Sequence, residues 1–308
     1  MSDALAGRVA LVTGGGRGVG RAIAEALHSA GAAVAIADNG TSIDGTGADP
    51  SVAEAMVKSL GARAVAFTES IASPSAAKSA VDLAVRRLGG LDIVINAAAI
   101  LRDAFIFKAE PENWDAVLRT NLSAAFHVLA AATPVMREQA KANRGGAPYA
   151  WGRIVNIVST AGLYGNYGQA AYASAKAGLV GLTRVVALDM ARSGVTANAV
   201  APFAATRVTE TIKPANPAQA AYKERALKIP ARAVGELVAW LAGPEAKDVT
   251  GQLFGVRGRE IFVFSQPRPV ARLVNPGDGL GAAIASALKP HFIGPETDLE
   301  AFSGEPIV

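Results

Sequence analysis

Tyr172 and Lys176 form the pair of residues with the clearest chemical potential in this sequence. The surrounding pattern predicts a helix over residues 170–191, and a spacing of four places both side chains on one face of it. A phenol with a pKa near ~10 is a weak base at neutral pH, and a neighbouring ammonium lowers that pKa. The pair therefore suits general acid–base chemistry on a hydroxyl group. By itself, the spacing is also that of an ordinary surface pair.

Ser159 and Asn121 extend this group. Ser159 follows a predicted strand over residues 153–158, and ligands of parallel sheets bind at the carboxyl ends of the strands. Its hydroxyl can hold a substrate carbonyl or alkoxide oxygen. Asn121 interrupts a predicted helix, where its amide can either bridge a water to Lys176 or stabilise a local kink.

A glycine-rich turn follows the first predicted strand. It reads Thr13-Gly14-Gly15-Gly16-Arg17-Gly18-Val19-Gly20, and a predicted helix begins within it. Side chains here would keep a pyrophosphate away from the backbone, and a helix N-terminus offers free N–H groups to it. The spacing is T-G-x-x-x-G-x-G and does not fit G-x-G-x-x-G. A strand before it, a helix after it and an acid downstream favour a dinucleotide site over a flexible loop.

Asp38 is that acid, at the end of the second predicted strand. Its carboxylate can accept both ribose hydroxyls of NAD and would repel the 2′-phosphate of NADP. Arg17, within the turn, has the opposite preference because a guanidinium can bind that phosphate. We favour NAD, since a directly placed like charge excludes more than a flexible arginine attracts.

The elements that must position these residues alternate along the chain. Near-continuous apolar strands separated by helices predict an α/β, Rossmann-type doubly wound parallel sheet of about seven strands, with helices on both faces. The predicted strands cover residues 8–12, 33–37, 64–67, 91–95, 153–158, 195–200 and 252–256, with a pairing partner for the last at 260–264. The predicted helices cover residues 19–29, 51–60, 75–88, 112–137 and 170–191.

We expect a single dinucleotide-binding and catalytic domain over residues 1–265. Residues 266–308 then form a C-terminal extension with one helix near 279–288 and an open role. Long loops at 39–50, 140–152 and 202–232 are of the kind that is usually functional or mobile. The last of them is basic and suits an anionic carrier such as CoA, or is an ordinary solvated face. Its cations are Arg207, Lys213, Lys223, Arg225, Lys228 and Arg232.

Composition narrows the function classes. The 308 residues include no cysteine, which excludes disulfides and zinc–thiolate sites, and three scattered histidines do not favour a metal site. The excess of 30 Lys and Arg over 26 Asp and Glu is small and unclustered, so a nucleic-acid partner is not expected. Apolar stretches are too short to span a bilayer. We expect a cytoplasmic protein that binds small molecules and no membrane.

These residues, in this order, resemble the short-chain dehydrogenase/reductase family over residues 7–256. The resemblance implies a catalytic tetrad of Asn121, Ser159, Tyr172 and Lys176. In it, tyrosine is the acid/base, lysine lowers its pKa and binds nicotinamide ribose, serine orients the substrate oxygen, and asparagine supports a proton relay. The implied cofactor contacts are Gly14, Gly16, Arg17, Gly18, Val19, Gly20, Asp38, Glu69, Ser70, Asn96, Ala97, Ala98, Tyr172, Lys176 and Pro202.

A narrower likeness concerns residues 99–103, 162–172 and 201–207. They resemble the (3R)-hydroxyacyl-CoA dehydrogenase domain of peroxisomal multifunctional enzyme type 2. This implies NAD-dependent oxidation of a (3R)-hydroxyacyl-CoA, with steroids and their CoA-linked side chains as further substrates of the family, and a homo-oligomer (tetramer or dimer). Apart from the resemblance, Tyr164 and Tyr167 follow Ser159 closely and are expected either to contact the substrate or to pack at a loop corner. Phe203 is expected either to line the substrate pocket or to pack the loop after the sixth strand.

Two departures from the family pattern concern the nicotinamide pocket. The family's N-N-A-G reads Asn96-Ala97-Ala98-Ala99, and its P-G reads Pro202-Phe203. Two alternatives therefore stay open beside the dehydrogenase. One is an NADPH-dependent 3-oxoacyl reductase with Arg17 as the phosphate anchor, and the other is a dinucleotide-binding scaffold without turnover.

Overall fold

Eight strands form one sheet at the centre of the computed structural model, which describes residues 3–211 and 217–308. The strand order is β3-β2-β1-β4-β5-β6-β7-β8, and only the last pair is antiparallel. The strands are β1 (Val9–Thr13), β2 (Ala33–Ala37), β3 (Ala64–Phe67), β4 (Ile93–Asn96), β5 (Gly152–Ile157), β6 (Val195–Phe203), β7 (Leu253–Arg257) and β8 (Glu260–Val263). The predicted fold class is confirmed, with β8 as the pairing partner of the seventh strand.

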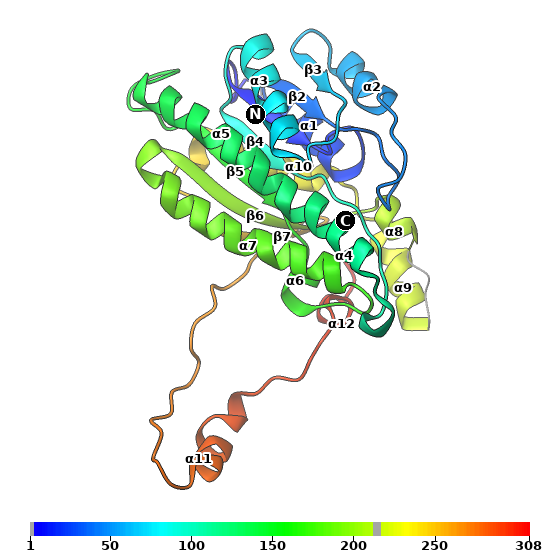
Figure 1. Cartoon of the computed structure of the whole chain (residues 1–308), viewed down its shortest axis with the longest axis vertical. Coiled ribbons are helices and arrows are strands. Elements are labelled where there is room, and N and C mark those ends of the chain that lie inside the picture. Colours follow the sequence, from blue (N-terminus) through cyan, green and yellow to red (C-terminus); the bar gives the residue numbers. More distant parts are fainter. Residues whose placement is uncertain (1–2, 212–216) are drawn as a thin grey trace.

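Helices cover both faces of the sheet (Figure 1). On one face lie α1 and α10, with α2 beside them, and on the other lie α3, α5 and α7. The helices are α1 (Gly18–Ser29), α2 (Ser51–Leu60), α3 (Pro74–Leu88), α4 (Pro111–Leu118), α5 (Ala124–Lys141), α6 (Ala161–Tyr164), α7 (Ala170–Met190), α8 (Arg207–Thr211), α9 (Pro217–Ala226), α10 (Arg232–Ala242), α11 (Leu280–Ala287) and α12 (Asp298–Ala301).

The alternation of side chains along β1 explains why its whole sequence is apolar. Ala10 and Val12 face the layer of α1 and α10, whereas Val9 and Leu11 face the layer of α3 and α5. Successive residues of a strand point to opposite faces, so a strand covered on both sides is apolar throughout. The same reasoning applies to β4, all of whose residues are buried.

The helix predicted over residues 112–137 is interrupted. It divides into α4 and α5, and one π-helical turn, Arg119–Ser123, lies between them and contains Asn121. Such single π turns occur frequently at functional sites.

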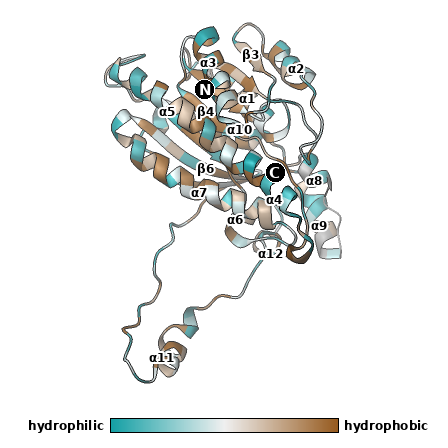
Figure 2. Ribbon diagram, in the orientation of Figure 1, coloured by the Kyte–Doolittle hydropathy of each residue, from teal (hydrophilic) through white to brown (hydrophobic). Residues whose placement is uncertain are grey.

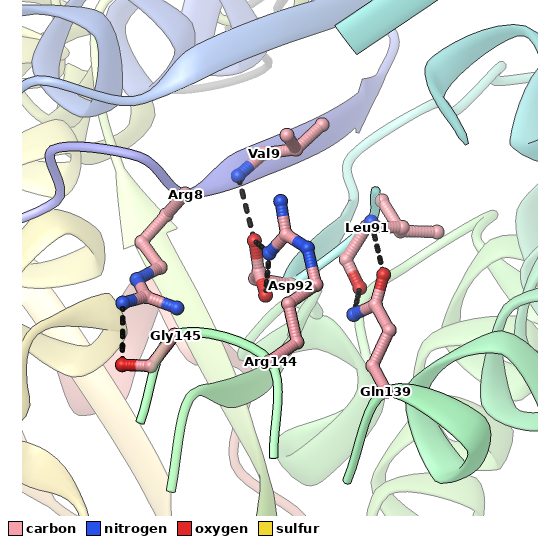
Figure 3. A network of polar contacts seen from close by, with 7 residues as sticks. All are labelled: Arg8, Val9, Leu91, Asp92, Gln139, Arg144 and Gly145. Atoms are coloured by element: carbon pink, nitrogen blue, oxygen red, sulfur yellow. Dashed lines mark hydrogen bonds and ion pairs between the residues drawn. The ribbon is translucent and has the colours of Figure 1, made fainter. Parts of the chain in front are cut away.

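The amino-terminal edge of the sheet is closed by a polar network (Figure 3). The buried carboxylate of Asp92 accepts hydrogen bonds from the Val9 N–H and the Arg144 guanidinium. The Gln139 side chain donates to the Leu91 carbonyl and accepts from the Leu91 N–H, both at 2.8 Å. The long loop before β5 therefore has a structural role at this edge.

The C-terminal extension leaves the body after β8 and comes back to it. Its middle part, with α11, stands away from the rest of the molecule (Figure 1), and no residue of α11 is buried. Figure 2 colours much of this helix as hydrophobic. The extension then returns, and α12 packs against the body beside α6.

Candidate active site

A cavity of about 1170 Å³ opens at the carboxyl edge of the sheet. Its walls come from the segments that follow β1, β2, β3, β4, β5 and β6, and from α7, α9 and α12. The strand order reverses between β1 and β4, and the crevice at such a reversal is where open α/β sheets bind their ligands.

The glycine turn forms one wall of this cavity. Gly14 has φ +64°, and a Cβ added to it would lie 2.8 Å from the Ala98 backbone. A Cβ on Gly20 would lie within 2.1 Å of the Gly14 carbonyl oxygen. No side chain fits at either position, so the backbone of the turn and the start of α1 stay open to the cavity. That is the shape a dinucleotide pyrophosphate requires.

Asp38 is hydrogen-bonded both to the glycine turn and to the segment that follows β2. Its Oδ2 accepts a hydrogen bond from the Gly16 N–H at 2.9 Å, and its Oδ1 accepts one from the Gly40 N–H at 2.8 Å. Gly16 itself does not line the cavity; its role is to hold the carboxylate. Arg17 lines the cavity and donates to the Thr41 carbonyl at 2.6 Å.

Arg207 lies close to Asp38 and Arg17 at this end of the cavity. Burial lowers the pKa of Arg207, the positive charge of Arg17 lowers it further, and the carboxylate of Asp38 opposes both. One acid and two arginines therefore line this end of the cavity. Glu69 and Ser70, which follow β3, also line the cavity.

The segment after β4 is held by Thr13. The Thr13 hydroxyl accepts hydrogen bonds from the N–H groups of Ala97 and Ala98, at 3.1 and 3.3 Å, and both alanines line the cavity. Asn96 does not line it. Its amide is buried and its Nδ2 donates to Asn156 Oδ1 at 2.8 Å, so this donor is used inside the sheet.

Ser159, Tyr172 and Lys176 all line the cavity, opposite the glycine turn. Lys176 is buried; its ammonium donates to the Ile157 carbonyl at 2.7 Å and lies 5.6 Å from the centre of the Tyr172 ring. The structure thus brings the three residues together at the end of β5, as their spacing indicates. Pro202, at the end of β6, lies on the same cavity.

Burial dominates the protonation of this pair. It raises the pKa of Tyr172 to about 12, while a hydrogen bond with the Ser159 hydroxyl acts in the opposite direction. It lowers the pKa of Lys176 to about 8. Lys176 is not among the groups that shift the pKa of Tyr172, so the lowering by Lys176 expected from the sequence is not found in the protein alone. A further positive charge, such as that of an oxidised nicotinamide, is needed to favour the phenolate.

Asn121 lies beneath the cavity and does not line it. Its side-chain amide donates to the Ile100 carbonyl at 2.9 Å and accepts from the Ile100 N–H at 2.8 Å. Both ends of the amide are thus used to hold the segment after β4. These bonds support a positioning role for Asn121, and its part in a proton relay with Lys176 stays a prediction.

The three expected substrate contacts separate into two groups. Tyr167 and Phe203 line the cavity. Tyr164 does not; it lies in a smaller separate hollow and packs edge-on against the ring of Phe302. Its place at a loop corner could not be distinguished from a substrate contact by spacing.

Sequence reasoning missed residues that come from far along the chain. Asp298 and Leu299 of α12, and Tyr222 and Ala226 of α9, line the cavity near Tyr172. One signal for α12 was available. Thr297 and Glu300 form a capping box, and the pattern T-x-x-E predicts the start of a helix there.

The basic loop after β6 uses most of its cations locally. Lys228 pairs with Glu224, Arg232 pairs with Glu236, and Arg225 donates to the Ser303 carbonyl. Lys213 lies outside the described residues. These pairings favour solvated helix faces over a cluster dedicated to CoA.

The comparisons with known proteins agree with this geometry. Residues 8–219 match the family described as short chain dehydrogenase. The chain belongs to the short-chain dehydrogenase family. Its members carry out oxidoreduction at hydroxyl and keto groups with a nicotinamide dinucleotide, and the open glycine turn of this chain fits such a cofactor.

Relatives within the short-chain dehydrogenases include acyl-CoA enzymes. Hydroxyacyl-CoA dehydrogenase ChsB1 of Mycobacterium tuberculosis is 37% identical over 300 residues, which cover 97% of this chain and 92% of the relative. Peroxisomal multifunctional enzyme type 2 of Mus musculus is 36% identical over 253 residues, 81% of this chain and 31% of that protein. The narrower likeness drawn from the sequence is thus confirmed.

A reductase and a solved structure complete the comparison. The 3-oxoacyl-[acyl-carrier-protein] reductase FabG of Escherichia coli is 35% identical over 254 residues, 82% of this chain and 96% of the relative. The crystal structure of a short chain dehydrogenase from Mycobacterium avium has a TM-score of 0.78 and 36% identity, and the match covers 96% of this chain and 98% of that one.

Among residues 3–211 and 217–308, no helix has the length and apolar character needed to cross a membrane. The same residues contain no group of three or more histidine, aspartate or glutamate side chains arranged to hold a metal ion.

Proposed function

We propose that this short-chain dehydrogenase oxidises a 3-hydroxyacyl-CoA to the 3-oxoacyl-CoA with NAD, steroid-linked acyl chains included. The observation that carries the proposal is that Ser159, Tyr172 and Lys176 share one cavity with the glycine turn and Asp38. The hydroxyacyl-CoA relatives support the choice of substrate. The bound dinucleotide supplies the chemistry of hydride acceptance.

Each residue of the site has a role in this reaction. The Ser159 hydroxyl holds the substrate oxygen, and Tyr172 accepts the hydroxyl proton. Lys176, held by the Ile157 carbonyl, places a positive charge beside the phenol and offers donors to the nicotinamide ribose. Asn121 fixes the segment after β4 through Ile100, which keeps the wall of the pocket in place.

The preference for NAD rests on Asp38. Two N–H groups hold its carboxylate at the cavity, and a fixed negative charge there supports the exclusion of a 2′-phosphate. Arg17 and Arg207 oppose this preference from the same end of the cavity. They favour the second candidate, an NADPH-dependent 3-oxoacyl reductase, as does the likeness to FabG. A scaffold without turnover has only Ala97 and Ala99 in its support.

We also propose a homo-oligomer, a dimer or a tetramer. The projecting part of the C-terminal extension exposes large apolar side chains, and a second copy of the chain would remove them from water. They are Val270, Val274, Leu280, Phe292 and Ile293. Light scattering of the purified chain should give two or four times the monomer mass, and a monomer at micromolar concentration would overturn this. The cytoplasmic location stays a prediction from the sequence.

A nicotinamide absorbance screen tests the reaction. The protein is offered NAD and NADP with 3-hydroxyacyl-CoAs of several lengths, a steroid alcohol and a simple secondary alcohol. We expect the fastest turnover with NAD and a 3-hydroxyacyl-CoA. Faster reduction of 3-oxoacyl thioesters with NADPH would support the reductase alternative. No absorbance change with any pair of cofactor and substrate would support the dinucleotide-binding scaffold without turnover.

A further inference from the structure

The helix α12 is fixed to the body although the chain before it projects outward. The Phe302 ring, just after α12, packs 4.7 Å from the ring of Phe203 and edge-on against Tyr164. The Arg257 guanidinium donates to the carbonyls of Phe302 and Gly304, at 2.9 and 3.0 Å. These contacts hold α12 as part of the cavity wall.

Asp298, the first residue of α12, is buried inside this wall. Only 7% of it is exposed, and its Oδ2 accepts a hydrogen bond from the Thr160 hydroxyl at 3.0 Å. Its Oδ1 is also buried and has no hydrogen-bond partner in the part of the chain that the structure describes. Asp298 lines the cavity beside Leu299, so the side chain that carries this unpartnered oxygen adjoins the substrate space.

Helix capping alone does not account for this oxygen. The N–H groups of Leu299 and of Asp298 itself act on the carboxylate at the start of α12, but among the described residues neither forms a hydrogen bond of normal geometry with Oδ1. Burying a polar group without such a bond is costly, and more so when the group is charged. A serine or an asparagine would accept the Thr160 hydrogen bond at lower cost. The unsatisfied oxygen thus points to a ligand that completes its hydrogen bonding.

The surroundings restrict the chemistry of that ligand. The phenols of Tyr172 and Tyr222 are near enough to Asp298 that its charge raises the pKa of both. Among the described residues, Asp298 belongs to no group of three or more side chains that could hold a metal ion, and an anion would be repelled. A neutral hydrogen-bond donor, an N–H or an O–H, is the group that suits a carboxylate oxygen here.

We propose that Asp298 is a substrate-binding residue, supplied by the C-terminal helix, whose Oδ1 accepts a hydrogen bond from an amide N–H or a hydroxyl of the substrate. The inference rests on the proposed function, because it takes the cavity to hold an acyl thioester. Two parts of such a substrate carry the donor. The carrier arm beyond the sulfur has amide N–H groups, and the acyl or steroid part can carry a hydroxyl.

Binding of three unreactive thioesters to the full-length protein, with and without NAD, tests this inference. Octanoyl-N-acetylcysteamine has an amide N–H on the carrier side. The S-butyl thioester of octanoic acid has no donor, and the S-butyl thioester of ω-hydroxyoctanoic acid has only a hydroxyl on the acyl side. Titration calorimetry gives Kd for the wild type, for Asp298→Asn and Asp298→Ala, and for Asp278→Asn. The last removes one charge from an exposed residue of the same extension and serves as the matched control.

We expect Asp298→Asn and Asp298→Ala to weaken one donor-bearing thioester about tenfold and to leave the plain thioester within twofold. The thioester that responds identifies the source of the donor. Asp278→Asn should change none of the three. Equal weakening of all three ligands, no weakening, or no binding to the wild type would overturn the proposal. An equal loss is what a purely structural residue would give.

Failure of the proposed function would look different. None of the three thioesters carries a 3-hydroxyl, so their binding does not depend on turnover. If Asp298 selects the donor-bearing thioester but the protein oxidises no 3-hydroxyacyl-CoA, the proposed function is overturned and the binding role of Asp298 stands. If the protein oxidises 3-hydroxyacyl-CoA but shows no selection through Asp298, only the binding role of Asp298 is overturned.

Discussion

One buried carboxylate lies at each end of the parallel strands, Asp92 at the amino ends and Asp298 at the carboxyl ends. The two carboxylates differ in how their oxygens are hydrogen-bonded. Asp92, at the amino edge, accepts hydrogen bonds from the Val9 N–H and the Arg144 guanidinium on its two oxygens (Figure 3). Asp298, at the carboxyl edge, has one oxygen on the Thr160 hydroxyl and one with no partner among the described residues. Both oxygens of Asp92 therefore have hydrogen-bond partners within the protein, whereas one oxygen of Asp298 has none among the described residues.

The hydrogen bonding of single buried atoms thus helps to distinguish a structural carboxylate from one that binds a ligand. A buried charge that is fully hydrogen-bonded holds its neighbours in place, and nothing more is needed to explain it. A buried polar atom with no partner indicates a ligand only where its residue also lines a cavity. Asp298 is such a case, because its unpartnered oxygen belongs to a residue that lines the cavity.

The largest effect is expected from Tyr172→Phe at the carboxyl edge. Removal of the proton acceptor should lower kcat/KM for a 3-hydroxyacyl-CoA by about 10²–10⁴-fold. The Kd for NAD, from fluorescence titration, should stay within a few-fold because the phenyl ring remains. Tyr149→Phe, remote from the cavity, is the control and should keep full turnover. Full turnover in Tyr172→Phe would remove the proposed mechanism.

Asp92→Asn should have the next largest effect, on stability and not on catalysis. It breaks a buried ion pair, and such changes cost about 3–5 kcal/mol; the lower end applies because Arg144 is partly exposed. Thermal unfolding should show a clear fall in Tm, with unchanged kcat at a temperature well below it. Asp82→Asn breaks an exposed pair with Lys78 and should cost no more than ~0.5 kcal/mol. Equal losses in the two variants would contradict the contrast between the edges.

Asp38 lies between these two cases. Each of its oxygens already accepts one N–H, yet the carboxylate still lines the cavity. Asp38→Asn removes the repulsion of a 2′-phosphate, so the ratio of kcat/KM with NADP to that with NAD should rise at least about tenfold. Arg17→Gln should lower that ratio. If Arg17→Gln abolishes NADP use and Asp38→Asn changes the ratio little, the result would support the NADPH-dependent reductase over the NAD-dependent dehydrogenase.

Local patterns predicted most of the fold and part of the site. Apolar runs predicted the strands because a strand buried on both faces has no polar alternation. The glycine turn was predictable because side chains there would keep a pyrophosphate away from the backbone. The set of Ser159, Tyr172 and Lys176 followed from strand ends and helical spacing. The places of Asn96 and Tyr164 did not, because they are decided by partners, Asn156 and Phe302, distant in sequence.

The contribution of α12 was the least predictable feature. Thr160 and Asp298 are 138 positions apart, and their contact depends on the return of a projecting segment. No periodicity or spacing encodes such a return. The capping box at Thr297 marks where a short helix begins, but it does not indicate what that helix covers.

The smallest effect, and the closest test of the contrast between the edges, concerns the pH dependence of stability. Burial raises the pKa of Asp298 above its ordinary value, and the Thr160 hydrogen bond only partly opposes it. A raised folded-state pKa contributes stability that is present below the ordinary aspartate pKa and is lost as pH rises through the folded-state pKa.

Asp298→Asn cannot undergo that loss, so its Tm relative to the wild type should increase from pH 4 toward neutral pH and then stay constant. The whole change should amount to a few degrees at most. Scanning calorimetry of both proteins in the same buffers measures it, with Asp278→Asn as the exposed control that should show no such trend. A Tm difference that is constant from pH 4 to 8, or one that falls, would mean that Asp298 is as well satisfied as Asp92. The carboxyl edge would then hold no unfilled acceptor for a substrate.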